Sequence, residues 1–100
     1  MILFEWDEAK AESNRRKHGV AFEDAVEVFE DTYLVIELER VVEGEQRWQA
    51  LGLAGDVTLL LVACTFRDAE QNEIIRIISA RKAEKREHVI YGKNRQKNSF

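Results

Sequence analysis

The most restrictive feature of the sequence is the apolar run from Val57 to Phe66, VTLLLVACTF. Thr58 and Thr65 are its only polar residues, so a strand made of this run presents apolar side chains on both faces over most of its length. Strands of that kind lie at the centre of a sheet that is covered on both sides. The run is too short to cross a bilayer. We therefore expect a globular domain with this segment as its central strand.

Two helices are expected before the other sheet residues, after a short strand over Ile2–Trp6. Asp7 offers an N-cap oxygen, basic residues crowd positions 15–18, and Gly19 suits the position after a helix end. A helix is therefore predicted over Asp7–His18. A second helix of about nine residues follows, because apolar residues recur at i, i+3, i+4 and i+7. These residues are Phe22, Ala25, Val26 and Phe29.

From residue 33 onward the hydrophobic period changes to that of strands. We predict strands over Tyr33–Leu38, Arg47–Leu53, Val57–Phe66 and Ile74–Ala80. The turns between them fall at residues 43–45, 55–56 and 68–72. Such short links between consecutive strands favour an antiparallel meander. A helix from Lys82 to Tyr91, ended by Gly92, is expected to follow the last strand.

This order of elements predicts an α+β fold, in which a small antiparallel sheet carries the two N-terminal helices on one face and is followed by a C-terminal helix. The other face of the sheet is left as a working surface. The chain of 100 residues has room for one domain, which we place at residues 1–92, with a flexible tail over 93–100.

Cys64 is the one cysteine of the chain, so no internal disulfide is possible, and its place in the central strand predicts a buried side chain. A lone cysteine and two histidines offer no metal-ligand spacing. The start MILFEWDEAK has acids where a signal peptide needs basic residues. We expect a soluble cytoplasmic protein with no metal, no cofactor and no membrane partner.

The formal net charge of −4 conceals an uneven distribution. Residues 1–75 carry 7 basic and 17 acidic side chains, whereas residues 76–100 carry 8 basic and 2 acidic ones. A basic cluster at 15–18 interrupts the acidic part. This pattern is compatible with a cationic surface for a polyanion and an acidic surface for another partner. On charge alone, a solvated helix face followed by a frayed tail is the simpler explanation.

The residue types suit one reaction in particular, the cleavage of RNA without a metal ion. That reaction needs a base for the 2′-hydroxyl proton, an acid for the 5′-oxygen and cations for the charge at phosphorus. His18 is a candidate base, because the neighbouring Lys17 favours the neutral imidazole. An equal alternative is a cation at a helix end that interacts with the helix dipole.

Two arginines lie at the last predicted strand. Strict alternation places Arg81 on the same face as Ile75 and Ile77, and Arg76 on the opposite face. We expect Arg76 to form a structural ion pair and Arg81, at the junction of strand and helix, to contact a phosphate.

The tryptophans and the polar residues of the strand predicted over Arg47–Leu53 have two interpretations each. Trp6 and Trp48 could stack on bases, but packing in the core is favoured. Arg47 and Gln49 fit a polar working face of the sheet, and an ordinary solvent face explains them equally well. His88 is expected to be exposed on the final helix.

Two segments of the chain resemble the BrnT family. The first matches the opening pattern F-x-W-D-x-x-K-x-x-x-N-x-x-K-H-G-V-x-F-x-x-A at Phe4, Trp6, Asp7, Lys10, Asn14, Lys17, His18, Gly19, Val20, Phe22 and Ala25. The second resembles the closing pattern R-I-I-S-A-R-x-A-x-x-x-E, and it covers residues 76–81, Ala83, Glu87 and Tyr91. The resemblance spans almost the whole chain, up to Gly92.

The resemblance implies the toxin of a bacterial type II toxin–antitoxin pair, with a RelE/ParE-like fold. Such a toxin is a metal-independent endoribonuclease that cleaves mRNA and inhibits translation. Its expected partners are an RNA substrate and an antitoxin with a ribbon-helix-helix domain, which neutralises the toxin in a hetero-oligomer. The complex is expected to bind operator DNA only through the antitoxin.

In this hypothesis the catalytic surface consists of Lys17, His18, Arg81 and Tyr91. Lys17 or His18 acts as base or acid, Arg81 holds the scissile phosphate, and Tyr91 orients a group or donates a proton. RNA is expected to bind at Arg15, Arg16, Lys82 and Lys85.

Two alternatives stand beside the enzyme. The first is a non-enzymatic interaction module on the same scaffold, which would need only the cationic surface and an edge for a partner. The second is that the matching residues serve the fold: Asp7 as a cap, Lys10 in a pair, Asn14 in bonds to the backbone, and Gly19 at the helix end.

Overall fold

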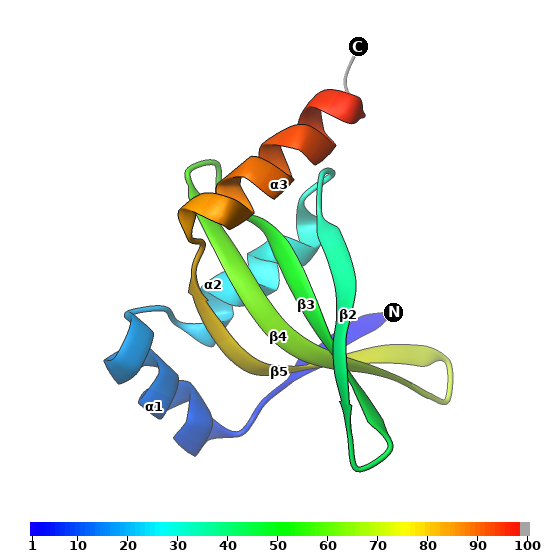
Figure 1. Ribbon diagram of the computed structural model, residues 1–100. Helices are drawn as coiled ribbons and strands as arrows, with labels where there is room; N and C mark the ends of the chain where they lie inside the picture. Colours follow the sequence, from blue (N-terminus) through cyan, green and yellow to red (C-terminus); the bar gives the residue numbers. More distant parts are fainter. Residues whose placement is uncertain (99–100) are drawn as a thin grey trace.

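A computed structural model of the protein describes residues 1–98 (Figure 1). The described residues form one five-stranded sheet, three α-helices and a short 3-10 helix. In chain order the elements are β1 (Ile2–Glu5), α1 (Glu8–His18), α2 (Phe22–Glu27), η1 (Val28–Glu30), β2 (Val35–Val42), β3 (Glu45–Ala54), β4 (Thr58–Ala69), β5 (Asn72–Lys82) and α3 (Lys85–Lys97). The predicted α+β class is confirmed.

The sheet has the strand order β1-β5-β4-β3-β2, so the apolar segment predicted as the central strand lies at the centre, in β4. Strands β2 to β5 form the expected antiparallel meander. The prediction of a purely antiparallel sheet is wrong, because β1 pairs with β5 in parallel. Short links determine the direction of consecutive strands only, and β1 is separated from β5 by two α-helices, the 3-10 helix η1 and three strands.

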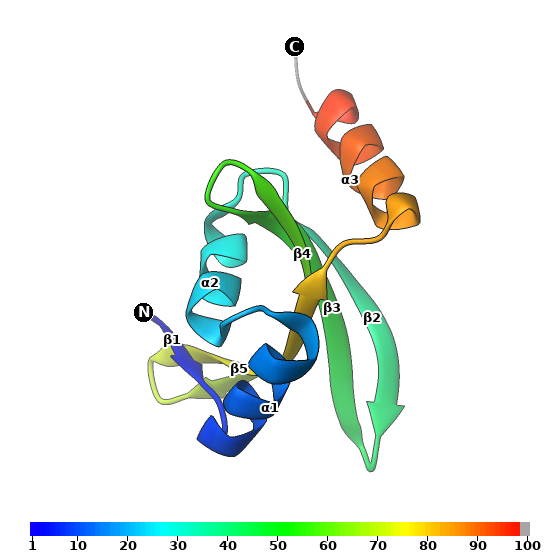
Figure 2. The same ribbon diagram turned by 90° about the vertical axis from the view of Figure 1, so that its left-hand side faces the viewer.

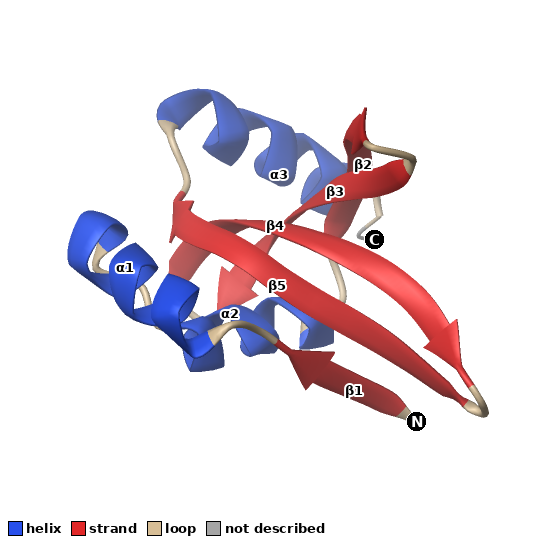
Figure 3. Cartoon of the chain, turned by 90° about the horizontal axis from the view of Figure 1, so that it is seen from below, coloured by secondary structure: helices blue, strands red, loops and turns tan. Residues whose placement is uncertain are grey.

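The sheet divides the helices between its two faces (Figures 2 and 3). Helix α2 covers one face, α1 lies beside the edge of β5, and α3 lies across the opposite face, which we call the α3 face. The main core lies under α2 and η1, where Phe22, Ala25 and Val28 are fully buried. A smaller cluster under α3 contains Leu51, Leu59, Leu61 and Tyr91.

Cys64 and both tryptophans pack as expected. Cys64 is fully buried, and burial raises the pKa of its thiol to about 12. Trp6 packs edge-on against Phe22, with ring centroids 5.8 Å apart, and Trp48 packs against Phe66 at 6.0 Å. These aromatic contacts join β1 and β3 to the main core.

The predicted signals at the ends of α1 are confirmed. The Asp7 Oδ1 atom accepts hydrogen bonds from the backbone N–H groups of Ala9 (2.8 Å) and Lys10 (3.2 Å). Gly19 has φ 71° and donates its N–H to the Arg15 carbonyl. Helix α2 is shorter than expected, because the chain tightens into η1 at Val28. Val28, and not Val26, therefore completes the fully buried stripe.

A buried asparagine joins α1 to the edge of β5. Strand β1 pairs with β5 only as far as Arg76, and beyond that point the Asn14 side chain takes the free edge. Its amide donates to the carbonyls of Val20 (3.1 Å) and Ala80 (2.8 Å), and its oxygen accepts from Ala80 N–H (3.1 Å). The prediction that Asn14 bonds to the backbone is confirmed. The ion pair expected for Lys10 is not found among the described residues.

Two β-bulges interrupt the regular alternation of the sheet. In β5, Ser79 pairs with Ala63 and Ile77 with Cys64, so Ile78 is an extra residue. The alternation predicted for Arg81 is therefore wrong: after the bulge, Ala80 enters the main core, while Ser79 and Arg81 turn to the α3 face. Bulges commonly redirect a side chain in this way.

The second bulge lies in the edge strand β2, between Leu38 and Arg40. Leu38 pairs with Trp48, and Arg40 pairs with Arg47, so Glu39 is the extra residue. Arg40 consequently shares the α3 face with Arg47.

The predicted ion pair of Arg76 is confirmed, since its Nη1 lies 3.2 Å from Glu5 Oε2.

The C-terminal helix runs further than predicted, because Gly92 does not end it. Beyond Gly92, Asn94 donates its side-chain amide to the Tyr33 carbonyl (2.9 Å), and the Arg95 guanidinium lies 5.2 Å from the centre of the Tyr33 ring. These contacts hold residues 93–97, expected in a tail, in helical conformation. The last two residues of that predicted tail, 99–100, lie outside the described residues.

Gly52 allows η1 to approach β3 closely. A Cβ atom at this position would lie 3.0 Å from Val28 Cγ1 and 3.1 Å from the Val28 carbonyl oxygen. We expect Gly52→Ala to lower the free energy of unfolding by about 2 kcal/mol, as in other overpacked cores. Gly92→Ala is the matched control, because nothing lies near its Cβ and alanine favours a helix interior. Urea unfolding of both variants tests this, and equal midpoints would contradict the close contact.

Candidate active site

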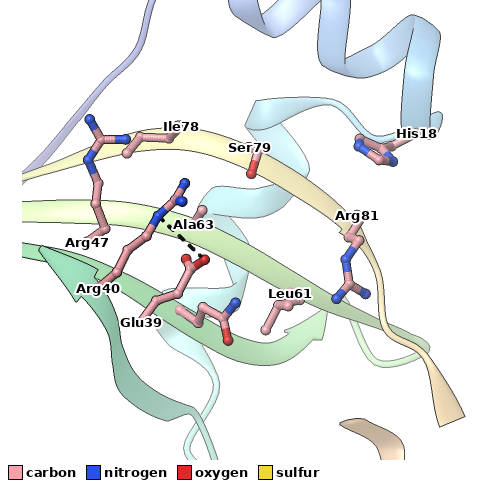
Figure 4. Close-up of a pocket in the computed structure, with 10 residues that line it drawn as sticks. His18, Glu39, Arg40, Arg47, Leu61, Ala63, Ile78, Ser79 and Arg81 are labelled. Atoms are coloured by element: carbon pink, nitrogen blue, oxygen red, sulfur yellow. Dashed lines mark ion pairs between the residues drawn. The ribbon is translucent and has the colours of Figure 1, made fainter. Parts of the chain in front are cut away.

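An open cavity of about 270 Å³ lies on the α3 face of the sheet (Figure 4). Strand β4, at the centre of the sheet, contributes Leu61 and Ala63 to the lining of the cavity. The other residues that line it come from α1, β2, β3 and β5; they are His18, Glu39, Arg40, Arg47, Gln49, Ile78, Ser79 and Arg81. The cavity thus combines three guanidinium groups, one imidazole and one carboxylate.

The fold features described above bring these side chains together. The bulge in β5 turns Ser79 and Arg81 toward the cavity, and the bulge in β2 does the same for Arg40. His18 is the last residue of α1, and Asn14 fixes this helix against the edge of β5. Figure 4 shows the His18 imidazole close to Arg81, at the β5 side of the cavity.

The three arginines differ in how firmly they are held. Arg40 lies 3.9 Å from Glu39, and Arg47 donates to Glu45 at 3.0 Å, with both carboxylates partly exposed. Ion pairs of this kind contribute little to stability, about 0–1 kcal/mol. Arg40 and Arg47 can therefore exchange these carboxylates for an incoming anion at small cost.

Arg81 is held much more firmly, by a buried carboxylate of α3. Its Nη1 and Nη2 atoms donate to the two oxygens of Glu87, each at 2.8 Å, and Nη1 also donates to the Lys82 carbonyl at 3.2 Å. Glu87 is only 4% exposed. The Arg81 hydrogen bonds lower the pKa of Glu87 against the opposing effect of burial. Of the five N–H donors of a guanidinium, two remain for a ligand.

The structure brings together two of the four residues predicted as catalytic, His18 and Arg81. Lys17 is exposed and does not line the cavity. Tyr91 is on the buried side of α3, outside the cavity, and its hydroxyl donates to Asp31 Oδ2 at 2.6 Å. Burial and this hydrogen bond raise the pKa of Tyr91 to about 12.

The predicted RNA-binding residues are dispersed. Arg15 lines a groove between α1 and the start of α2, and Lys82 lines another beside Gly19. Arg16 and Lys85 are exposed, outside the cavity. A role for these residues in binding RNA remains a prediction.

Glu39 and Arg40 were absent from the predicted site. In VIELERVV, the apolar and polar residues alternate up to Glu39, and Arg40 then breaks the alternation. Two adjacent charged residues inside a strand are a signal of a bulge that could have indicated this part of the cavity. Arg47 and Gln49, for which a working face was one of two interpretations, do line the cavity.

Within residues 1–98, no group of three or more His, Cys, Asp or Glu side chains is arranged to hold a metal ion. None of the helices in that part of the chain is long and apolar enough to cross a membrane.

A small α+β domain with arginines, a histidine and a carboxylate around one cavity has the make-up of a protein that acts on a phosphodiester. Residues 6–87 match the family described as "Ribonuclease toxin, BrnT, of type II toxin-antitoxin system". The chain belongs to this BrnT family, which confirms the resemblance of its opening and closing segments. Membership implies an RNA substrate and an antitoxin partner.

The chain is also similar to a solved structure, the ribonuclease toxin BrnT of Brucella abortus. The two share 26% sequence identity, with a TM-score of 0.57, over 85% of this chain and 99% of the Brucella chain. No curated protein matches the sequence.

Proposed function

We propose that this chain cleaves mRNA in the cavity of the α3 face, without a metal ion, and so inhibits translation. The observation that carries the proposal is that His18 and Glu39 line the same cavity as three arginines. The family to which the chain belongs is described as a ribonuclease toxin, and this supports the same activity. An antitoxin of the ribbon-helix-helix type is proposed to neutralise the chain in a hetero-oligomer.

The arginines bind the phosphate that is to be cleaved. Arg40 and Arg47 leave their exposed carboxylate partners and turn to the phosphate oxygens, since planar guanidinium groups suit such bidentate contacts. Arg81 stays on Glu87 and offers its two remaining N–H groups. Together they stabilise the negative charge that builds up at phosphorus.

Glu39 and His18 move the two protons. The Glu39 carboxylate accepts the proton of the 2′-hydroxyl while the 2′-oxygen forms a bond to phosphorus. The bond from phosphorus to the 5′-oxygen breaks, and protonated His18 gives its proton to that leaving oxygen. The products are a 2′,3′-cyclic phosphate and a 5′-hydroxyl. Tyr91, bonded to Asp31, supports α3 and takes no part in these steps.

Two pairs of variants test the chemistry. We expect His18→Ala to slow cleavage of a synthetic RNA about 10²–10⁴-fold, the usual share of a general acid. His88→Ala is its control, because His88 is exposed on α3, outside the cavity. Glu39→Gln is expected to have an effect of similar size, and Glu43→Gln, in the exposed turn after β2, is expected to have none. Cleavage is measured with and without EDTA.

Full activity of His18→Ala or Glu39→Gln would refute these roles, and loss of wild-type activity in EDTA would refute the metal-free reaction. A wild-type chain that binds RNA and leaves it intact would identify the interaction module instead. Expression in a bacterium, with growth and RNA integrity followed together, links cleavage to translation. Coexpression with a ribbon-helix-helix antitoxin should restore growth.

A further inference from the structure

A narrow slot adjoins the cavity and runs beneath α3. Its volume is about 60 Å³, and it is lined by Val35, Glu37, Gln49, Leu51, Leu61, Arg86, Glu87 and Ile90. Gln49 and Leu61 line the slot and the cavity alike, so the two are neighbours on the α3 face. Any chain whose phosphate lies in the cavity therefore has the slot beside it.

We propose that one nucleobase of the RNA lies at the mouth of the slot, which is too small to enclose a whole base, and that Gln49 recognises the edge of the base that enters it. The proposal rests on the proposed function for the phosphate in the neighbouring cavity. It adds a specificity site, which selects the base beside the cleaved bond.

The residues that line the slot suit a base whose ring lies at its mouth. Leu51 and Leu61 come from adjacent strands of the sheet, and Ile90 faces them from α3. Ile90 is 39% exposed, so a ring that lies at the mouth of the slot would cover an apolar side chain. Arg86 lines the same slot, and a guanidinium plane is a common stacking partner of unpaired bases.

Gln49 is the polar group best placed to recognise the base. It is half-buried in β3, directly between Glu37 of β2 and Ala63 of β4. Its side-chain amide forms no hydrogen bond with any described residue. An amide offers donors and an acceptor together, the combination that reads the edge of a base. A ligand in the slot would supply the missing partners.

Glu37 narrows the choice of base. Glu37 is the residue of β2 directly opposite Gln49, and it lines the same slot as an exposed residue. An ionised carboxylate accepts hydrogen bonds and donates none. Bases with an exocyclic amino group (adenine, cytosine and guanine) therefore fit better than uracil.

The slot is held open before RNA binds, because α3 is fixed at several points. Glu87 bonds Arg81 below the slot, Tyr91 bonds Asp31, and Asn94 bonds the Tyr33 carbonyl. A site formed in advance loses little conformational entropy on binding.

The test compares Gln49→Leu with Gln46→Leu. Gln46 is exposed on the same strand, and it pairs with Val41 beyond the slot. Synthetic RNAs that differ only in the base beside the cleaved bond are cut by each variant. We expect the wild-type chain and Gln46→Leu to cut the amino-bearing bases about tenfold faster than uracil, and Gln49→Leu to lose this difference, as expected for one bidentate contact to a base. Glu37→Gln, at the exposed mouth, is a second variant in case Gln49→Leu fails to fold.

A base profile that is the same in wild-type protein and both slot variants would overturn the proposal. If no RNA is cut at all, the proposed function fails, and nucleotide binding still tests the slot. AMP, CMP and GMP should then shift the NMR signal of the Gln49 side-chain amide, whereas ribose 5-phosphate should not. No shift with any nucleotide, or an equal shift with ribose 5-phosphate, would refute the slot independently of catalysis.

Discussion

Replacement of Asn14 by alanine is expected to lower the free energy of unfolding by about 3 kcal/mol, because it leaves buried backbone groups without hydrogen bonds. The change removes three hydrogen bonds at a site that is only 7% exposed. It leaves the Ala80 N–H and the carbonyls of Val20 and Ala80 without their partner. A polar group left buried without a partner costs about 1–3 kcal/mol, and partial access of water reduces the sum.

The measurement is thermal and urea unfolding of Asn14→Ala beside Ser13→Ala. Ser13 is the exposed neighbour in the same helix, so its replacement should leave stability unchanged or raise it slightly. For a domain of this size, 3 kcal/mol corresponds to a fall in Tm of roughly 15 °C. Cleavage should fall as well, at temperatures where the variant is folded, since Asn14 fixes α1 and thereby His18 at the cavity. Equal stability of the two variants would show that the three bonds do not form in solution.

Asn14 also shows what the sequence could reveal and what it could not. The pattern of caps predicted α1, and a backbone bond from Asn14 was one expected role. Nothing in the local sequence indicated that the partner is Ala80, which lies 66 residues away at the edge of β5. The edge is free there because β1 is short, and the length of β1 next to β5 is a property of the assembled sheet.

The candidate site was predictable to the extent that regular periodicity defines it. Hydrophobic patterns located every strand and the central position of β4, because burial in this sheet follows alternation. The bulges at Ile78 and Glu39 interrupt that alternation. Each of them moves an arginine, Arg81 or Arg40, onto the face of the cavity. A one-residue shift inverts the face of every later residue, so the site could not be derived from regular strands.

The end of α3 was missed for a related reason. Gly92 is a frequent helix terminator, but only where the chain then turns into the left-handed conformation. Here Tyr91, Asn94 and Arg95 contact residues 31–33, which lie between η1 and β2, and the helix continues to Lys97. Packing between distant segments outweighs the local preference of one glycine, which is about 1 kcal/mol.

Glu87→Gln is expected to be the most damaging change of a single charge in this domain. The variant keeps the shape of the side chain and loses the ionic bidentate contact to Arg81, at 2.8 Å on both oxygens. Removal of one partner of a buried ion pair costs about 3–5 kcal/mol, and because Arg81 is partly exposed we expect about 2 kcal/mol at pH 7. The capping bond from the Glu84 backbone N–H to Glu87 Oε1 (2.7 Å) can be kept by the amide oxygen.

The pH dependence of stability gives a second signature. Arg81 lowers the pKa of Glu87 below the ordinary value of 4.5, so the folded state favours the ionised carboxylate. Its contribution is complete above pH 4.5 and is lost as the pH falls through the lower pKa of the folded protein. Glu87→Gln should therefore differ most from wild type above pH 4.5 and converge with it in acid. Hydrogen bonds from Arg67 and Arg76 lower the pKa of Glu5 to about 2, against the opposing effect of burial. Glu5 is present in both proteins, so each of them still loses some stability in acid.

Cleavage kinetics separate positioning from mere stability. Without Glu87 the Arg81 guanidinium loses its fixed orientation, and we expect kcat to fall about tenfold, the loss of one well-placed charge contact. KM should not rise, because the variant also removes a negative charge beside the cavity that repels RNA. Glu73→Gln, exposed on the same strand as Arg81, removes an equal charge far from the cavity and should change neither constant. A Glu87→Gln protein with wild-type kcat and an unchanged pH profile of stability would show that Arg81 needs no carboxylate to hold it, and that α3 does not position the site.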